Sequence, residues 1–174
     1  YEYVRKDNGV ALYNDNNPRL SEKIFKKVNR AVPFSDPTGI ELIIEQVPSA
    51  MNIELNATYQ HQKYNIKTNL FGSYNLENLK AAIATSLFFD VTMKNIIDAV
   101  ENYQPANNRS QVKKTKNNTL ICDAYNANPT SMHLALKAFS EISEDNKMVI
   151  LGEMLELGEK SEEEHKKSLV EVLA

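Results

Sequence analysis

The polar residues best able to do chemistry gather in the stretch DAYNANPTSM. Asp123, Tyr125 and Asn126 follow an apolar run and come directly before Asn128, a proline and a helical pattern. Ligands of open parallel sheets bind beyond the carboxyl ends of strands, where an aspartate can accept hydrogen bonds from ribose hydroxyls. Asn128 is equally well explained as a helix N-cap. A cap does not explain the crowding of the other three residues.

Other polar residues admit two interpretations each. Arg109 could hold a phosphate through its planar guanidinium, although most arginines in polar segments are simply solvated. Asn75 and Asn78 are three residues apart, so a helix places them on one face, where two amides could read an adenine edge or serve as a cap and a solvated neighbour. Glu153 and Glu156 could contact a metal or an amine, or simply suit a helix dipole.

Composition limits the class of protein. The chain has 174 residues, 42% hydrophobic and 25% charged, with a net charge of -3, which is typical of a soluble globular protein without a nucleic-acid-binding charge excess. A single cysteine, Cys122, excludes an internal disulfide and favours a reducing cytoplasm. His165, within EEEHKK, is predicted to be a solvated histidine. No apolar run has the length of a membrane span, and no P-loop motif occurs.

The apolar patterns predict an α/β chain in two parts. Residues 9–15 are typical of a strand, and a helix follows from Pro18. Alternation over residues 40–70 predicts antiparallel strands with a turn at QHQ, and two helices follow, the second capped by Thr92. Residues 104–118 are rich in charge and turns. We therefore predict domains over residues 1–105 and 106–174.

The second part is predicted to be a parallel sheet. TLICDAY and KMVILGEM have strand patterns, and each is followed by a helical pattern. Alternation of this kind indicates right-handed βαβ units. A doubly wound domain usually has more than two strands, and the sequence begins within a pattern. We therefore expect the chain to be a piece of a longer protein.

These motifs, taken together, resemble the Mur ligase family. The resemblance is carried by DAYNANPTSM, by VILGEMLELG with a later histidine, and by GSYNLENLKAAIA, which comes first along the chain. VALYNDNNPRL is similar to a further family segment. The resemblance implies that residues 1–105 are the end of the family's central ATP-binding domain. Residues 106–174 would then start its Rossmann-like C-terminal domain, with the N-terminal domain, P-loop and metal ligands outside this chain.

The resemblance also implies roles for individual residues. Asn75 and Asn78 match the family's pair of residues that borders the adenine. Arg109 matches an arginine that binds the phosphates, and Asp123 matches an acid that binds the ribose. Tyr125, Asn126 and Asn128 match a family loop that would face the dipeptide or the nucleotide. No catalytic or metal-ligating residue is expected within the chain. The sequence departs from the family at Tyr74, where a histidine is common, and it has LGEM where LGDM is usual.

The activity implied is that of an ATP-dependent amide ligase of peptidoglycan precursor synthesis. With ATP and Mg²⁺, the carboxylate of UDP-N-acetylmuramoyl-tripeptide would become an acyl phosphate, which the amine of D-alanyl-D-alanine attacks. The partners would be these small molecules, without nucleic acid, and the isolated chain is expected to be inactive. Alternatives are another Mur ligase, a folylpolyglutamate synthase, or a non-catalytic module with the ligase fold.

Overall fold

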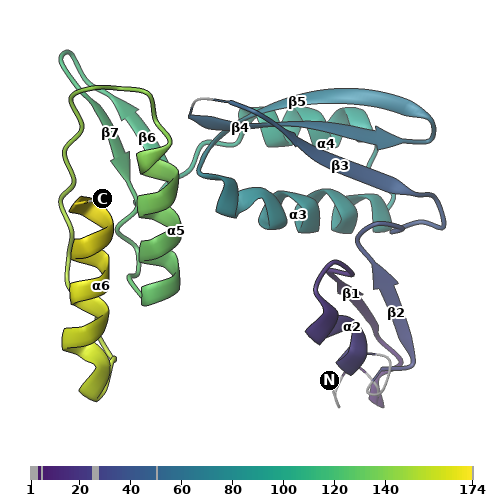
Figure 1. The fold of residues 1–174 in the computed structure, drawn as a ribbon. Helices are drawn as coiled ribbons and strands as arrows, with labels where there is room; N and C mark the ends of the chain where they lie inside the picture. The colour runs from purple at the N-terminus through teal and green to yellow at the C-terminus, as the bar shows by residue number, and fades with distance from the viewer. Residues whose placement is uncertain (1–3, 5, 25–27, 50, 174) are drawn as a thin grey trace. The chain divides into compact units, whose positions relative to one another are not determined.

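The computed structural model describes residues 4, 6–24, 28–49 and 51–173 (Figure 1). The chain forms two compact units, each assembled from three stretches of sequence. Unit 1 consists of Tyr1–Val47, Glu54–Lys67 and Leu76–Asn102. Unit 2 consists of Pro48–Ile53, Thr68–Asn75 and Tyr103–Ala174. Among the described residues, no helix is long and apolar enough to cross a membrane.

Unit 1 begins with a small parallel βαβ element. β1 (Val10–Tyr13) pairs in parallel with β2 (Arg30–Pro33), and α2 (Pro18–Ile24) lies between them in sequence. Pro18 at the first position suits the start of the helix. Asn17, which precedes it, accepts a hydrogen bond through Oδ1 from the backbone N–H of Arg19 at 3.1 Å. The predicted strand followed by a helix is confirmed, whereas β2 was not predicted.

A three-stranded sheet follows, with strand order β3-β4-β5. Its strands are β3 (Leu42–Val47), β4 (Asn52–Tyr59) and β5 (Gln62–Phe71). Gln60 and His61 form the predicted turn, with φ angles of 51° and 63°, because a two-residue hairpin requires left-handed backbone at both positions. The buried positions alternate along β4, as expected of a strand with one face in the core.

Two helices complete the part of the chain before residue 103. They are α3 (Leu76–Phe88), which continues from the short 3₁₀ turn η1 (Ser73–Asn75), and α4 (Met93–Asn102). The backbone N–H of Asn95 donates to Thr92 Oγ1 at 3.4 Å, so the predicted cap of α4 is confirmed. Ile83 of α3 is fully buried, in agreement with the predicted apolar stripe.

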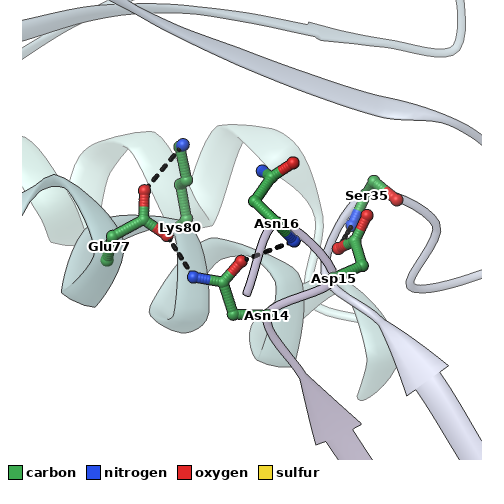
Figure 2. A network of polar contacts seen from close by, with 6 residues as sticks. All are labelled: Asn14, Asp15, Asn16, Ser35, Glu77 and Lys80. Carbon is green, nitrogen blue, oxygen red and sulfur yellow. Dashed lines mark hydrogen bonds and ion pairs between the residues drawn. The ribbon is translucent and has the colours of Figure 1, made fainter. Parts of the chain in front are cut away.

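Polar side chains link the end of β1 to α3 within unit 1 (Figure 2). Asn14 Nδ2 donates to Glu77, whose other carboxylate oxygen pairs with Lys80 Nζ at 2.8 Å. Asp15 Oδ1 accepts from the backbone N–H of Ser35 at 3.2 Å. The polar NDNNP segment therefore anchors the strand end in this structure.

Unit 2 is built on an antiparallel hairpin and two helices. β6 (Gln111–Lys114) pairs with β7 (Thr119–Cys122), and these are followed by α5 (Pro129–Ser140), η2 (Gly158–Lys160) and α6 (Ser161–Leu173). A buried cluster of Phe71, Ala138 and Ile142, against which Val112 and Ile121 pack, joins α5 to the hairpin and to the end of β5. β7 and both long helices agree with the sequence prediction.

The predicted parallel pairing within unit 2 is wrong for the described residues. β7 pairs with β6, which was assigned to a turn-rich linker, and residues 147–154 form no strand. Met148 is 78% exposed and Ile150 is 85% exposed. The residues have strand-forming side chains, but a strand also requires a neighbour for its backbone hydrogen bonds. The described part of the chain offers none to this segment.

Candidate functional site

The carboxylate of Asp123 is the centre of a polar cluster in unit 2. The residue directly follows β7, and antiparallel pairing brings it opposite Ser110, the residue before β6. Its Oδ1 accepts from the Ser110 backbone N–H at 2.9 Å, and its Oδ2 accepts from Tyr74 Oη at 2.8 Å. Bonds to a charged acceptor are stronger than bonds between neutral groups. The carboxylate therefore connects the strand ends to the turn before α3.

Tyr74 reaches this carboxylate because of the glycine two residues earlier. Gly72 has φ of 82°, and a Cβ built on it would lie 2.2 Å from Cε1 of the Tyr74 ring. Any other residue would both strain the backbone and displace the ring. Burial raises the pKa of Tyr74 well above its ordinary value, and the bond and charge of Asp123 add to this rise, while a hydrogen bond with Ser110 opposes it. The phenol is therefore held as a proton donor.

Hydrogen bonds from the end of β7 also shape the turn that carries Arg109. Asn107, Asn108 and Ser110 all have positive φ, at 57°, 55° and 47°, a conformation that costs free energy for residues other than glycine. The Asn108 carbonyl accepts from the Ala124 backbone N–H at 2.8 Å, and the Ser110 N–H is bound by Asp123. Arg109 lies between these two attachments. Its direction is thus set by the residues that follow β7.

The guanidinium of Arg109 stacks on a second predicted site residue. Arg109 Cζ lies 3.4 Å from the centre of the Tyr125 ring, close enough for a cation–π interaction. Tyr125 is 61% exposed, and Arg109 is exposed as well. The pair therefore presents a solvated cation held on an aromatic face, which a phosphate oxygen can approach.

The two asparagines at the start of α3 differ in position. Asn75 Nδ2 donates to the Phe71 carbonyl at 2.9 Å and to Ser110 Oγ at 3.0 Å, so its amide hydrogens both point into unit 2. Its neighbour Asn78, one turn further along, is exposed and belongs to unit 1. The structure thus joins Asn75 to the Asp123 cluster through Ser110.

The remaining residues of the DAYNANP loop divide between structure and solvent. Asn128 Oδ1 accepts from the Ser131 backbone N–H at 2.9 Å, and Ser131 Oγ accepts from the Asn128 N–H at 3.1 Å. These reciprocal bonds form a capping box at the start of α5. The capping interpretation of Asn128 is therefore confirmed. Asn126 is exposed.

Sequence reasoning missed two members of the cluster and misjudged a histidine elsewhere in unit 2. Ser110, buried among polar partners, carried no signal beyond its place next to Arg109. Tyr74 was noted only as a departure from a family pattern. His165 was predicted to be solvated, but both of its ring nitrogens are hydrogen-bonded. Its spacing from Ser161 and buried Ser168 would have placed it on the inner stripe of α6.

No metal site is formed by the residues described here. Within residues 4, 6–24, 28–49 and 51–173, no group of three or more His, Cys, Asp or Glu side chains is placed to hold a metal ion. The site described above presents the exposed cation of Arg109, the hydrogen-bonded carboxylate of Asp123 and several amides. This donor set suits the phosphates, ribose and base of a nucleotide better than a bare cation.

Comparison with known proteins relates this chain to the Mur ligases. Residues 108–174 match the model of the Mur ligase glutamate ligase domain. A UDP-N-acetylmuramoyl-tripeptide–D-alanyl-D-alanine ligase of Bacillus subtilis is 34% identical over 99 residues, and that of Buchnera aphidicola is 26% identical over 164 residues. These matches cover 56% and 92% of this chain. Residues 108–174 of this chain thus match a Mur ligase domain, and the chain is similar to named Mur ligases over most of its length.

The fold agrees with that of a solved Mur ligase structure. The MurF ligase of Thermotoga maritima, determined in complex with ADP, superposes with a TM-score of 0.74 over 94% of this chain at 18% identity. At that identity the match supports the fold alone. The chain covers 22% of the length of the Bacillus protein, 35% of the Buchnera protein and 38% of the Thermotoga chain. It thus spans between about a fifth and two fifths of these proteins.

Proposed function

We propose that this chain is part of an ATP-dependent ligase that joins D-alanyl-D-alanine to UDP-N-acetylmuramoyl-tripeptide, in the cytoplasmic synthesis of peptidoglycan precursors. The names of the relatives in Bacillus and Buchnera support this activity. Residues 1–105 would form the end of the ATP-binding domain and residues 106–174 the start of the C-terminal domain. The observation that carries the proposal is the Asp123 cluster, which holds Arg109 and the predicted ribose acceptor on one hydrogen-bonded framework.

In this reaction the chain's residues would bind and orient the nucleotide. A carboxylate accepts about four hydrogen bonds. Each carboxylate oxygen of Asp123 accepts one short hydrogen bond, from Tyr74 or from the Ser110 N–H. Oδ1 also has a third, longer contact, with Ser110 Oγ at 3.5 Å. Oδ2 therefore retains capacity for a ribose hydroxyl. Asn75 and Asn78, at the start of α3, would border the adenine.

Arg109 would serve the phosphates. Its guanidinium stacks on the Tyr125 ring at the surface and can leave the ring to form a bidentate hydrogen-bonded contact with two phosphate oxygens. Such a contact is stronger than a solvent-exposed cation–π interaction. Mg²⁺ bound with the nucleotide would supply further neutralisation of phosphate charge, and we assign no residue of this chain to it. Tyr125, Asn126 and the amide of Asn128 would face the dipeptide or the nucleotide.

The test uses the product of the complete gene that contains this sequence. Phosphate release from ATP should require both the tripeptide precursor and D-alanyl-D-alanine, and L-alanine with UDP-N-acetylmuramate should not substitute. The 174-residue chain alone should release none. Arg109→Ala should lower kcat/KM for ATP about 10- to 100-fold, the loss expected of a charged hydrogen bond worth ~1.5–3 kcal/mol.

Matched variants separate binding from folding. Arg30→Ala is the control for the arginine, because Arg30 also lies over an aromatic ring, that of Phe88 at 5.9 Å, but in unit 1. Asp123→Asn preserves the local hydrogen bonds, since the new amide can accept from Ser110 and donate to Tyr74, yet it removes the charge. Normal turnover in both Arg109→Ala and Asp123→Ala would refute the site assignment.

A further inference from the structure

The imidazole of His165 bridges α6 and the loop that precedes it, within unit 2. Its Nε2 lies 3.0 Å from the backbone nitrogen of Met154, and its Nδ1 lies 2.7 Å from the carbonyl oxygen of Ser161, one helical turn earlier. The ring is half-buried, and Met154 is only 2% exposed. The bridge is therefore partly shielded from water.

The partners of the ring determine its protonation. A backbone N–H can only donate, so Nε2 of His165 must accept from Met154 with its lone pair. A carbonyl oxygen can only accept, so Nδ1 must carry the proton that points to Ser161. The neutral Nδ1–H tautomer satisfies both bonds, whereas a ring protonated on Nε2 loses the bond to Met154.

This bridge sets the orientation of the loop. Met154 is buried, whereas its neighbours Glu153 and Leu155 are exposed, Leu155 to 68%. The loop, α5 and α6 surround an open hollow of about 500 Å³ whose lining includes Met132, Glu153, Met154 and His165.

We propose that His165 is a positioning residue, which docks residues 151–157 onto α6 through its neutral Nδ1–H tautomer and thereby presents the Glu153 carboxylate to solvent. Glu153 follows an apolar strand-like run and precedes a helix. In the proposed ligase this carboxylate would hold the ammonium group of the dipeptide substrate, a step that rests on the proposed function. The docking itself does not rest on it.

The docking is tested on the 174-residue chain by NMR. A long-range ¹H–¹⁵N spectrum of the histidines should show His165 protonated on Nδ1 at neutral pH, and the Met154 amide should exchange slowly with solvent. His165→Leu should speed that exchange at least tenfold. His165→Gln should keep it within about threefold, because the glutamine oxygen can reach the place of Nε2. His133→Gln, a change of another histidine of unit 2, should have no effect.

Each outcome decides one part of the proposal. An Nε2–H tautomer, or equal Met154 exchange in the leucine variant and the wild type, would overturn the docking. Equal exchange at Ile121 in all variants shows that the hairpin is intact. In the complete gene product, His165→Leu should raise KM for D-alanyl-D-alanine at least fivefold without changing KM for ATP. An unchanged KM in an active enzyme would overturn the role of Glu153, whereas an inactive wild type would count against the proposed function alone.

Discussion

Removal of one oxygen atom, by Tyr74→Phe, tests the cluster on which the candidate site depends. The substitution leaves the ring in place beside Gly72 and deletes only the hydroxyl. Asp123 Oδ2 then loses its donor at 2.8 Å, and Ser110 Oγ loses its neighbour at 3.0 Å. Because Ser110 and Asp123 shape the turn of Arg109, the loss should extend to that turn.

The size of the effect follows from the type and exposure of the bond. A hydrogen bond to a charged group contributes ~1.5–3 kcal/mol. Tyr74 is only half-buried and Asp123 is exposed, so water can replace part of this bond. We therefore expect unfolding of unit 2 to become easier by ~1 kcal/mol. A value of that size corresponds to about a fivefold change in an equilibrium constant.

The assay is amide exchange at Ser110 together with urea unfolding at pH 7.5. The Ser110 backbone N–H, which donates a hydrogen bond to Asp123, should exchange roughly fivefold faster in the phenylalanine variant. Tyr64→Phe is the control, since Tyr64 donates to the neutral amide of Gln62 at an exposed position, and it should change neither quantity measurably. Equal exchange and equal unfolding free energy in Tyr74→Phe and the wild type would refute the coupling.

Three further predictions concern the same unit. First, burial and Asp123 raise the pKa of Tyr74 in the folded state, so the folded state keeps the phenol proton after the unfolded state loses it near pH ~10. The wild type should therefore lose stability relative to Tyr74→Phe as the pH rises above that value. Unfolding free energies from urea that change in parallel for both proteins from pH 8 to 11 would contradict this. Second, Gly72→Ala should destabilise unit 2 by at least ~1 kcal/mol, because residue 72 has a positive φ and the added Cβ would clash with the ring of Tyr74. Gly152→Ala should be tolerated, because a Cβ at residue 152 meets no atom within 4 Å and its φ is not positive. Equal melting temperatures of the two variants would refute the steric reasoning. Third, Asn128→Ala should cost ~1 kcal/mol through the lost cap and Asn128→Ser much less, as measured by urea unfolding, and equal costs would show that the capping bond is unimportant.

Much of the site was within reach of the sequence, because its signals are local. The DAYNANP stretch predicted a strand end, a polar loop and a capped helix, and the structure places Asp123 after β7 and Asn128 at the cap of α5. Strand alternation, turn residues and caps depend on neighbours a few positions away. The family motifs are likewise contiguous.

Other features required tertiary structure, because their partners are distant in sequence. Tyr74 is 49 residues from Asp123, and no spacing rule relates them. The pairing of β6 with β7, in place of a parallel partner from residues 147–154, depended on which backbone groups actually met. The bonds of His165 depended on the loop that folded against α6.

The sequence by itself determined the long helices, most of the strands, the resemblance to the Mur ligase family and which polar residues end a strand, but it missed β2 and β6 and placed a strand at residues 147–154 that does not form. Only the tertiary structure decided what those polar residues hold: the Asp123 carboxylate fixes a turn, and Arg109 rests on Tyr125. The physical reason is that propensities and caps act over one or two turns of the chain. The direction and protonation of a side chain are set by whatever the fold places beside it.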